Sequence, residues 1–202
     1  MPAYALGGVV PVVSPDAFVH PLACLIGDVV IGPGCFVGPF ASLRGDMGRI
    51  EMEEGSNLQD GCVVHCFPGQ STVIERDGHV GHGAVLHGCR IGRGALIGMK
   101  SVVMDGAVIG AEAFVGAHSF VPAGMVVEDR WLVVGSPAQP KRPLTVQEIA
   151  WKANGTRSYQ DLARYYRSAL EEVTPLPTLE PDRPGLALAE MGNVPLHQHR
   201  SR

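Results

Sequence analysis

The sequence predicts an all-β fold in which short parallel strands wind into a coil, a parallel β-helix, and three observations support this. Aliphatic residues recur at every sixth position between 91 and 127, at Ile91, Ile97, Val103, Ile109, Val115, Val121 and Val127. A small residue usually lies two positions earlier, and Gly often follows directly. A fixed period indicates a repeat architecture, and a period of six fits neither a helix nor one long alternating strand. Each repeat therefore predicts one short strand and one corner.

The composition excludes several classes of function. The 202 residues suffice for one domain with a sizeable core, and the net charge of -4 argues against nucleic-acid binding. No apolar stretch approaches membrane length, and the first residues do not resemble a signal peptide. The odd number of cysteines, five, favours small core residues over disulfides, with Cys24, Cys35 and Cys62 at corner positions. We therefore expect a cytoplasmic protein with no membrane partner.

The chain divides into three predicted parts. Residues 1–140 form the β-helix, with a register slip between Gly45 and Gly55 and a protruding loop from Cys66 to His79. Residues 141–173 form C-terminal α-helices that pack on the coil. Thr145 begins the first helix in a capping-box pattern, and we expect it to stop at Asn154-Gly155 before a second helix opens at Ser158. Residues 174–202 are rich in Pro and predict an extended tail.

Polar residues replace the usual Gly at four positions of the repeat: Arg44, Gln59, His65 and His87. Because three rungs of six residues make one coil, residues about 18 apart should lie nearly above one another. His82 lies 17 positions after His65, so imidazoles of adjacent coils are expected to converge. Three His ligands with an open fourth position are typical of catalytic zinc, and imidazole also suits iron and cobalt.

Other polar residues near these histidines have predicted supporting roles. Gln59 and Asp60 are placed to orient a His ligand or the metal-bound water. Arg44 and Asp46 are two residues apart and suit an ion pair, which would fix the register of two subunits if it crossed between them. A solvent-facing His at a corner is more often a surface residue than a ligand, and five are assigned to that class: His20, His79, His118, His197 and His199.

These motifs resemble the gamma-class carbonic anhydrase family. The resemblance covers roughly residues 9–139 and is carried by Arg44-Gly45-Asp46, Asn57-Leu58-Gln59-Asp60, His65, His82 and His87. It implies a left-handed β-helix, a homotrimer, and a metal held at each interface by His65 and His87 of one subunit and His82 of its neighbour. It also implies that Gln59, Asp60 and Tyr159 are catalytic, and that Arg44 and Asp46 bridge subunits. The ring of Tyr159 could instead serve only to pack the second helix.

The run from Gly78 to Cys89 resembles the branch of this family found in phenylacetate-degradation and carnitine operons, which implies hydrolysis of CoA thioesters. The loop after His65 contains one glutamate, Glu75, so a fast proton shuttle for CO2 hydration is not expected. Four functions stay open. They are a metal-dependent hydrolase of acyl-CoA thioesters, a carbonic anhydrase, a metal-free hexapeptide acyltransferase that binds CoA, and a non-catalytic trimer stapled by metal.

Overall fold

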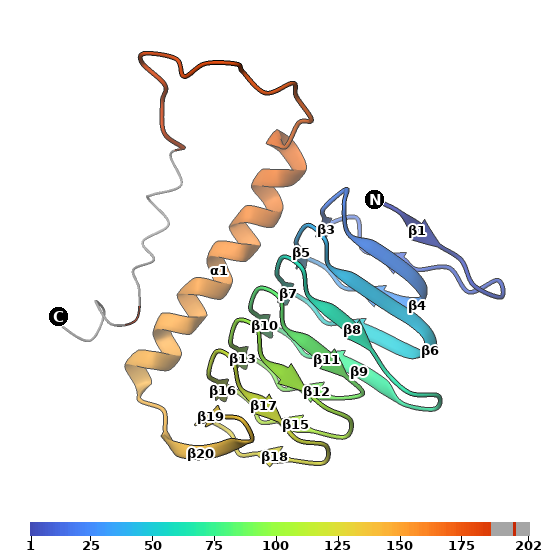
Figure 1. The fold of residues 1–202 in the computed structure, drawn as a ribbon, viewed down its shortest axis with the longest axis vertical. Helices are drawn as coiled ribbons and strands as arrows, with labels where there is room; N and C mark the ends of the chain where they lie inside the picture. Colours follow the sequence, from blue (N-terminus) through green and yellow to red (C-terminus); the bar gives the residue numbers. More distant parts are fainter. Residues whose placement is uncertain (187–195, 197–202) are drawn as a thin grey trace.

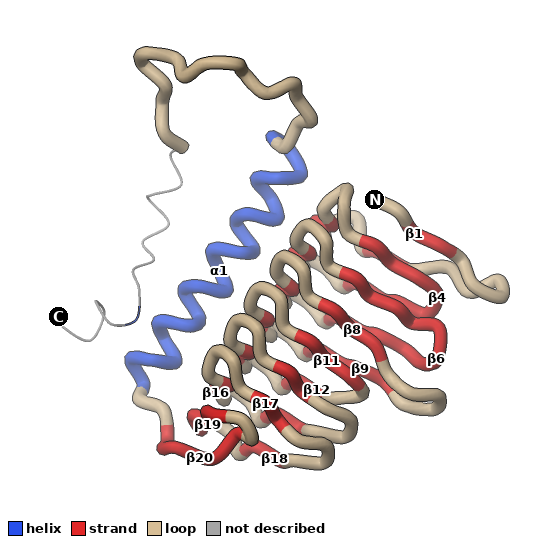
Figure 2. The backbone as a smooth tube through the Cα atoms, in the orientation of Figure 1, coloured by secondary structure: helices blue, strands red, loops and turns tan. Residues whose placement is uncertain are grey.

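The computed structural model describes residues 1–186 and residue 196, and it confirms the left-handed parallel β-helix with a C-terminal helix. Short strands stack along the axis of the coil in three faces, and α1 (Val146–Ala169) runs along one of them (Figures 1 and 2). One face is formed by β3 (Phe18–Val19), β5 (Phe36–Val37), β7 (Asn57–Leu58), β10 (His79–Val80), β13 (Leu96–Ile97), β16 (Phe114–Val115), β19 (Trp131–Gly135) and β20 (Ala138–Pro143).

The other two faces share one sheet because two long strands, β4 (Cys24–Ile31) and β6 (Ser42–Met52), run through both. The face that later carries the candidate site contains β8 (Val63–His65), β11 (Val85–His87), β14 (Val102–Val103) and β17 (Phe120–Val121). The remaining strands are β1 (Ala3–Tyr4), β2 (Val12–Val13), β9 (Ser71–Ile74), β12 (Arg90–Ile91), β15 (Val108–Ile109) and β18 (Val126–Val127).

The six-residue period predicts the interior correctly. The seven aliphatic residues from Ile91 to Val127 are each at most 3% exposed and belong to one continuous core. Val102 pairs with Phe120 in parallel register, and the neighbouring Ser119 hydrogen-bonds Ser101 across a separation of 18 residues, as expected for three strands per coil. Burial of the aliphatic side chains supplies the main driving force of the fold, roughly 1.5–3 kcal/mol for each large aliphatic side chain.

The glycines that follow the aliphatic residues are required by the spacing between coils. A Cβ on Gly98 would lie 2.4 Å from the backbone nitrogen of Ala117, and a Cβ on Gly92 would lie 2.5 Å from the carbonyl oxygen of Ile109. Both distances are far below van der Waals contact. Glycine is needed here because the next coil approaches the backbone closely.

The predicted loop from Cys66 to His79 is shorter than expected. Only the turn around residues 66–70 leaves the coil, and Ser71–Ile74 returns as β9, with Thr72 and Ile74 fully buried. The turn adds length to its coil, so that His65 and His87 are register neighbours although they are 22 residues apart. This extra length changes which polar residues lie above one another.

The two predicted C-terminal helices are one continuous helix, α1, so the expected stop at Asn154-Gly155 is wrong. The capping box is confirmed, because Thr145 and Glu148 hydrogen-bond each other's backbone nitrogens. Packing against the coil overrides the local stop signal. Ala163, together with Tyr159, Leu162 and Tyr166, forms a second apolar cluster on Phe18 and Phe36.

Among the described residues, no helix combines the length and the apolar character needed to cross a membrane. The five cysteines are free thiols; Cys35 and Cys62 are fully buried, as expected of small core residues, whereas Cys24 is partly exposed. Residues 174–186 follow α1 without forming a helix or strand. Most of the remaining predicted tail, including His197 and His199, lies outside the described residues.

Candidate functional site

Two of the predicted histidines meet on one face of the coil. His65 ends β8 and His87 ends β11, and the two residues are direct neighbours in the parallel register. The Nδ1 atom of His65 lies 3.0 Å from the Nε2 atom of His87. The side chains are 12% and 20% exposed, so the pair is largely shielded but open on one side. The paired strands thus hold two imidazoles in hydrogen-bonding contact.

Each imidazole is anchored by a carboxylate on its other nitrogen. Asp46 Oδ1 lies 2.9 Å from His65 Nε2, and Asp105 Oδ1 lies 2.6 Å from His87 Nδ1. The other oxygen of Asp46 accepts a hydrogen bond of 2.6 Å from Arg44. Burial alone would raise the pKa of Asp46, but the hydrogen bonds from Arg44 and His65 outweigh it and hold this pKa below its usual value.

The two carboxylates determine which ring nitrogens of His65 and His87 carry hydrogen. Ionised carboxylates only accept hydrogen bonds, so both of the imidazole nitrogens that face them must carry hydrogen. The bond between His65 and His87 needs one further hydrogen. That hydrogen lies on either Nδ1 of His65 or Nε2 of His87. The pair therefore places a ring N–H and a ring lone pair in contact at this face of the coil.

Asp105 belongs to this site, although the sequence analysis did not assign it a role. It lies 18 residues after His87, which is the spacing of one regular coil. That spacing was the available signal, because a carboxylate one coil beyond a histidine lies beside it. The prediction missed it because the polar cluster of the coil was expected to end at His87, and Asp105 lies beyond that range.

The turn after His65 closes the site. The ring of Phe67 packs edge-on against His87, with ring centroids 4.9 Å apart. Thr72 ties the two strands together, donating to the carbonyl oxygen of His65 at 2.7 Å and accepting from the Gly88 nitrogen at 2.9 Å. Burial, followed by the charges of Asp46 and Asp105, raises the pKa of the Cys66 thiol, so this neighbouring cysteine is not an activated nucleophile.

His82 does not join this pair. It hydrogen-bonds Asp60 and is about half exposed. The expected stacking of His82 on His65 is wrong because the turn at residues 66–70 lengthens this coil. At a spacing of 22 residues, His82 lies above Asp60 and His87 lies above His65.

The zinc prediction, with iron or cobalt as alternatives, is therefore wrong. Among residues 1–186 and 196, no group of three or more His, Cys, Asp or Glu side chains is placed to hold a metal ion. All four ring nitrogens of His65 and His87 are engaged with each other or with carboxylates. A metal ligand needs a free lone pair aimed at a common point, and these two rings direct none outward.

Gln59 of the coil and Tyr159 of α1 meet at His79, in a cluster between the helix and the coil. Gln59 is 3% exposed, and its side-chain nitrogen lies 2.7 Å from His79 Nε2 and 3.0 Å from Asn57 Oδ1. Tyr159 packs edge-on against His79 at 5.3 Å, and burial raises the pKa of its phenol to about 12. These contacts connect the coil to the helix, and they are separate from the hydrogen bonds of the histidine pair.

His79 is buried beneath α1, so the prediction that it is a surface residue is wrong. It lies between Asn57, Gln59 and Thr156 under the helix. Burial, with the positive charges of Lys152 and His82, lowers the pKa of His79 to about 3, so its ring is neutral. His79 directly precedes the inward Val80, and residues at such positions usually point outward from the coil. His79 differs because α1 covers it.

The fold and repeat place the chain in a known class. Residues 88–123 match the model described as bacterial transferase hexapeptide (six repeats). The solved structure of a hexapeptide transferase family protein from Anaplasma phagocytophilum is similar, at 37% identity and a TM-score of 0.79, and covers 82% of this chain and 98% of its own. A Bacillus cereus protein, proposed to be an acetyltransferase, matches at 33% identity and a TM-score of 0.81, over 82% of this chain and 96% of its own. The chain belongs to the hexapeptide-repeat family.

Within this family, the chain is similar to the carnitine operon protein CaiE. The protein from Salmonella agona (strain SL483) is 56% identical over 186 residues, which is 92% of this chain and 94% of the relative. The sequence motifs favour the phenylacetic acid degradation protein PaaY over CaiE as the nearer relative. The similarity found here supports the CaiE-like assignment.

Proposed function

We propose that this protein transfers an acyl group from a CoA thioester to a small acceptor, with His87 as the general base. The observation that carries the proposal is the histidine pair, in which a carboxylate fixes each ring and the two remaining nitrogens face each other. Asp105 holds the Nδ1 hydrogen of His87, so that Nε2 of this ring faces Nδ1 of His65 at 3.0 Å. A carboxylate that fixes the tautomer and orientation of a basic imidazole is the arrangement that general-base catalysis requires.

The proposed reaction begins when the hydroxyl or amine of the acceptor enters beside His87. The hydrogen between the two rings resides on Nδ1 of His65, where the carboxylate of Asp46 on the other nitrogen stabilises it, and Nε2 of His87 presents its lone pair to the acceptor. His87 then takes the acceptor proton as the acceptor attacks the thioester carbonyl. The tetrahedral intermediate collapses, the carbon–sulfur bond breaks, and the CoA thiolate leaves with the proton from His87. The products are the acylated acceptor and CoA thiol, and the histidine pair returns to its starting state.

The relatives support this class of reaction. One solved relative is named as a hexapeptide transferase family protein and another is proposed to be an acetyltransferase, and each covers 82% of this chain. Hydrolysis of the thioester is the same reaction with water as acceptor, so the expected thioesterase activity is retained here as the second outcome. Carbonic anhydrase activity and a metal-stapled trimer both required the three-histidine metal site, and they are not carried forward.

We also propose that the protein assembles as a homotrimer through the face of the coil that carries the site. Outward residues of β8, β11, β14 and β17 form an apolar ladder in register: Val63, Val85, Val102 and Phe120. Val63 and Phe120 are 44% and 37% exposed. A second copy on this ladder would cover the open side of the histidine pair and could complete the acyl-CoA site. The ion pair of Arg44 with Asp46 forms within one protomer at 2.6 Å, beside the same face.

A cytoplasmic location stays a prediction.

Release of free thiol from a panel of acyl-CoA substrates, with hydroxyl and amine acceptors, tests the function. For the substrate that is turned over, His87→Gln should lower kcat/KM by at least about 100-fold, the lower range for loss of a general base. His118→Asn is the matched control, because His118 is exposed and Asn tolerates its positive φ of 58°. Unchanged turnover in His87→Gln would refute the assignment of the base.

A further inference from the structure

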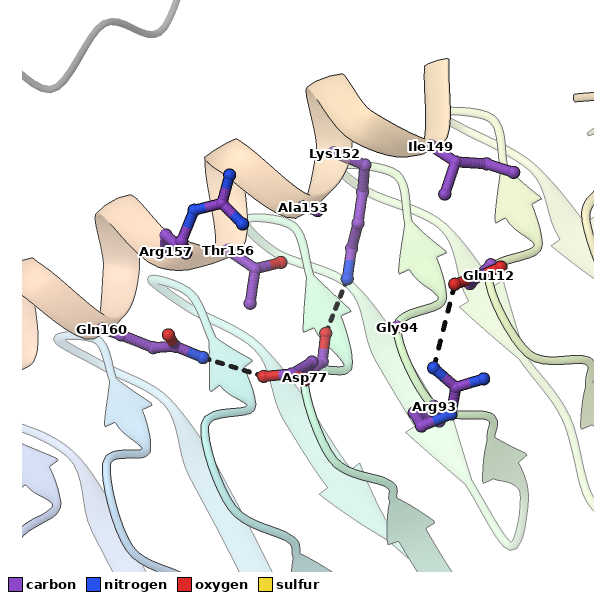
Figure 3. A pocket seen from close by; sticks show the side chains of 10 residues that line it. All are labelled: Asp77, Arg93, Gly94, Glu112, Ile149, Lys152, Ala153, Thr156, Arg157 and Gln160. Atoms are coloured by element: carbon purple, nitrogen blue, oxygen red, sulfur yellow. Dashed lines mark hydrogen bonds and ion pairs between the residues drawn. The ribbon is translucent and has the colours of Figure 1, made fainter. Parts of the chain in front are cut away.

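A cavity lies away from the histidine pair, between α1 and the turns of the coil. Its volume is about 340 Å³, and its lining includes Asp77, Arg93, Glu112, Lys152 and Arg157 (Figure 3). The proposed acyl transfer uses none of these residues. The cavity combines a helix, which supplies Lys152 and Arg157, with coil turns that supply the other three side chains.

Lys152 is the unusual residue of this cavity. Its side chain extends from the helix toward the coil, and the residue is 4% exposed (Figure 3). Its Nζ donates a hydrogen bond of 2.6 Å to the backbone carbonyl of Asp77. An ammonium group has three hydrogens to donate, so this bond satisfies one of them. Burial lowers the pKa of Lys152 to about 7, although the charges of Asp77 and Glu112 act in the opposite direction.

The surrounding charges leave a positive excess. Glu112 is paired with Arg130 at 2.6 Å, and Arg93 approaches it at 3.8 Å. Asp77 accepts a hydrogen bond of 2.8 Å from Gln160. The lining itself holds three cationic side chains, Arg93, Lys152 and Arg157, and two carboxylates, Asp77 and Glu112. His79, the remaining titratable neighbour of Lys152, is neutral because burial lowers its pKa to about 3. A buried ammonium with this neighbourhood suits an anion.

We propose that this cavity binds a phosphate group through Lys152, Arg157 and Arg93. Arginine forks match the oxygens of phosphate, and lysine provides a compact charge beside them. Phosphate carries between one and two negative charges near pH 7, which balances the positive excess. The group could come from free inorganic phosphate or from the phosphates of CoA, and the two sources share the chemistry that the cavity recognises.

Binding of the anion should pull a proton onto Lys152. At pH 7 an amine with a pKa of about 7 is half protonated, so binding should take up roughly half a proton, rising toward one at pH 8. Sulfate is the suitable probe for this measurement, because it has the shape and charge of dianionic phosphate and does not titrate in this range. Calorimetry of sulfate binding in two buffers with different ionisation enthalpies gives the proton count.

Isothermal titration of the full chain with inorganic phosphate tests the site itself. Lys152→Met keeps the length of the side chain without its charge, and Arg157→Gln changes an exposed residue with little effect on folding. Each should weaken phosphate binding at least about tenfold, as expected for loss of one charge-assisted hydrogen bond. The matched control is Arg167→Gln, on the same helix but outside the cavity. Proton uptake on sulfate binding should disappear in Lys152→Met.

Competition identifies the source of the phosphate. Displacement of bound phosphate by CoA in the wild-type protein assigns the cavity to a phosphate of CoA, and no displacement assigns it to free phosphate. Absence of phosphate binding below about 10 mM, or equal binding by Arg157→Gln and the wild type, overturns the proposal. These results do not depend on acyl transfer, so the site can fail while the proposed function stands, and the reverse.

Discussion

Burial of His79 should make the folded protein sensitive to mild acid. The ring is neutral in the folded state, with a pKa of about 3, because burial and two nearby positive charges disfavour its protonation. The unfolded chain has the ordinary pKa of about 6.5 and binds a proton below that value. The unfolded state therefore gains stability as pH falls from 6.5 toward 3, and the folded state does not. Above pH 6.5 both states are neutral, and His79 contributes no pH dependence.

The magnitude follows from the two pKa values. At pH 5 the difference in proton binding costs the folded state about 2 kcal/mol relative to pH 7.5. Replacing His79 with Gln retains a hydrogen-bonding side chain between Asn57 and Gln59 and removes the titrating ring. The loss of stability between pH 7.5 and 5 should then be smaller by about 2 kcal/mol in His79→Gln than in the wild type.

Urea denaturation at both pH values, at one fixed protein concentration, measures this difference. The concentration must be matched because the stability of an oligomer depends on it. His118→Asn serves as the control, since an exposed histidine should leave the wild-type pH dependence in place. If His79→Gln loses as much stability on acidification as the wild type, then His79 is not a buried neutral base, and the packing of α1 described here is incorrect.

Three further predictions follow from single side chains. Ile97→Ala truncates a fully buried core side chain and should lower the free energy of unfolding by roughly 2–5 kcal/mol in a thermal or urea titration. The control Val126→Ala, at a position 69% exposed, should change the same free energy by less than about 0.5 kcal/mol. Glu148→Ala removes both the capping box and the ion pair with Arg142, whose Nη2 lies 2.7 Å from Glu148, and should cost about 3 kcal/mol; an unchanged urea midpoint would contradict this. Asp105→Asn should retain the fold by circular dichroism but lower kcat/KM for thiol release by at least about 100-fold, because the amide no longer fixes the tautomer of His87; wild-type kinetics would remove Asp105 from the site.

The regular part of the coil could be predicted because its structure is encoded locally. Each inward residue from Ile91 to Val127 is recognised by its own period, and the corner glycines mark where the next coil approaches. The pairing of His65 with His87 could be approached in the same way, since both follow inward aliphatic residues. These features depend on spacing along the chain, which the sequence displays directly.

Other features depend on contacts that spacing alone does not specify. One turn at residues 66–70 changed the length of its coil and moved His82 onto Asp60 instead of His65. The continuity of α1 through Gly155 and the burial of His79 both result from packing of the helix on the coil. Local signals favoured a helix stop and a surface histidine, and tertiary burial outweighed them.

The central claim is that the histidine pair, oriented by Asp46 and Asp105, carries out acyl transfer from CoA by acid–base chemistry. Thiol release from the preferred acyl-CoA, before and after exhaustive chelation with metal content verified, tests this most directly. The account predicts that turnover in the presence of acceptor survives removal of metal and is lost in His87→Gln. Turnover that disappears on chelation and returns with one added divalent metal ion would contradict the account.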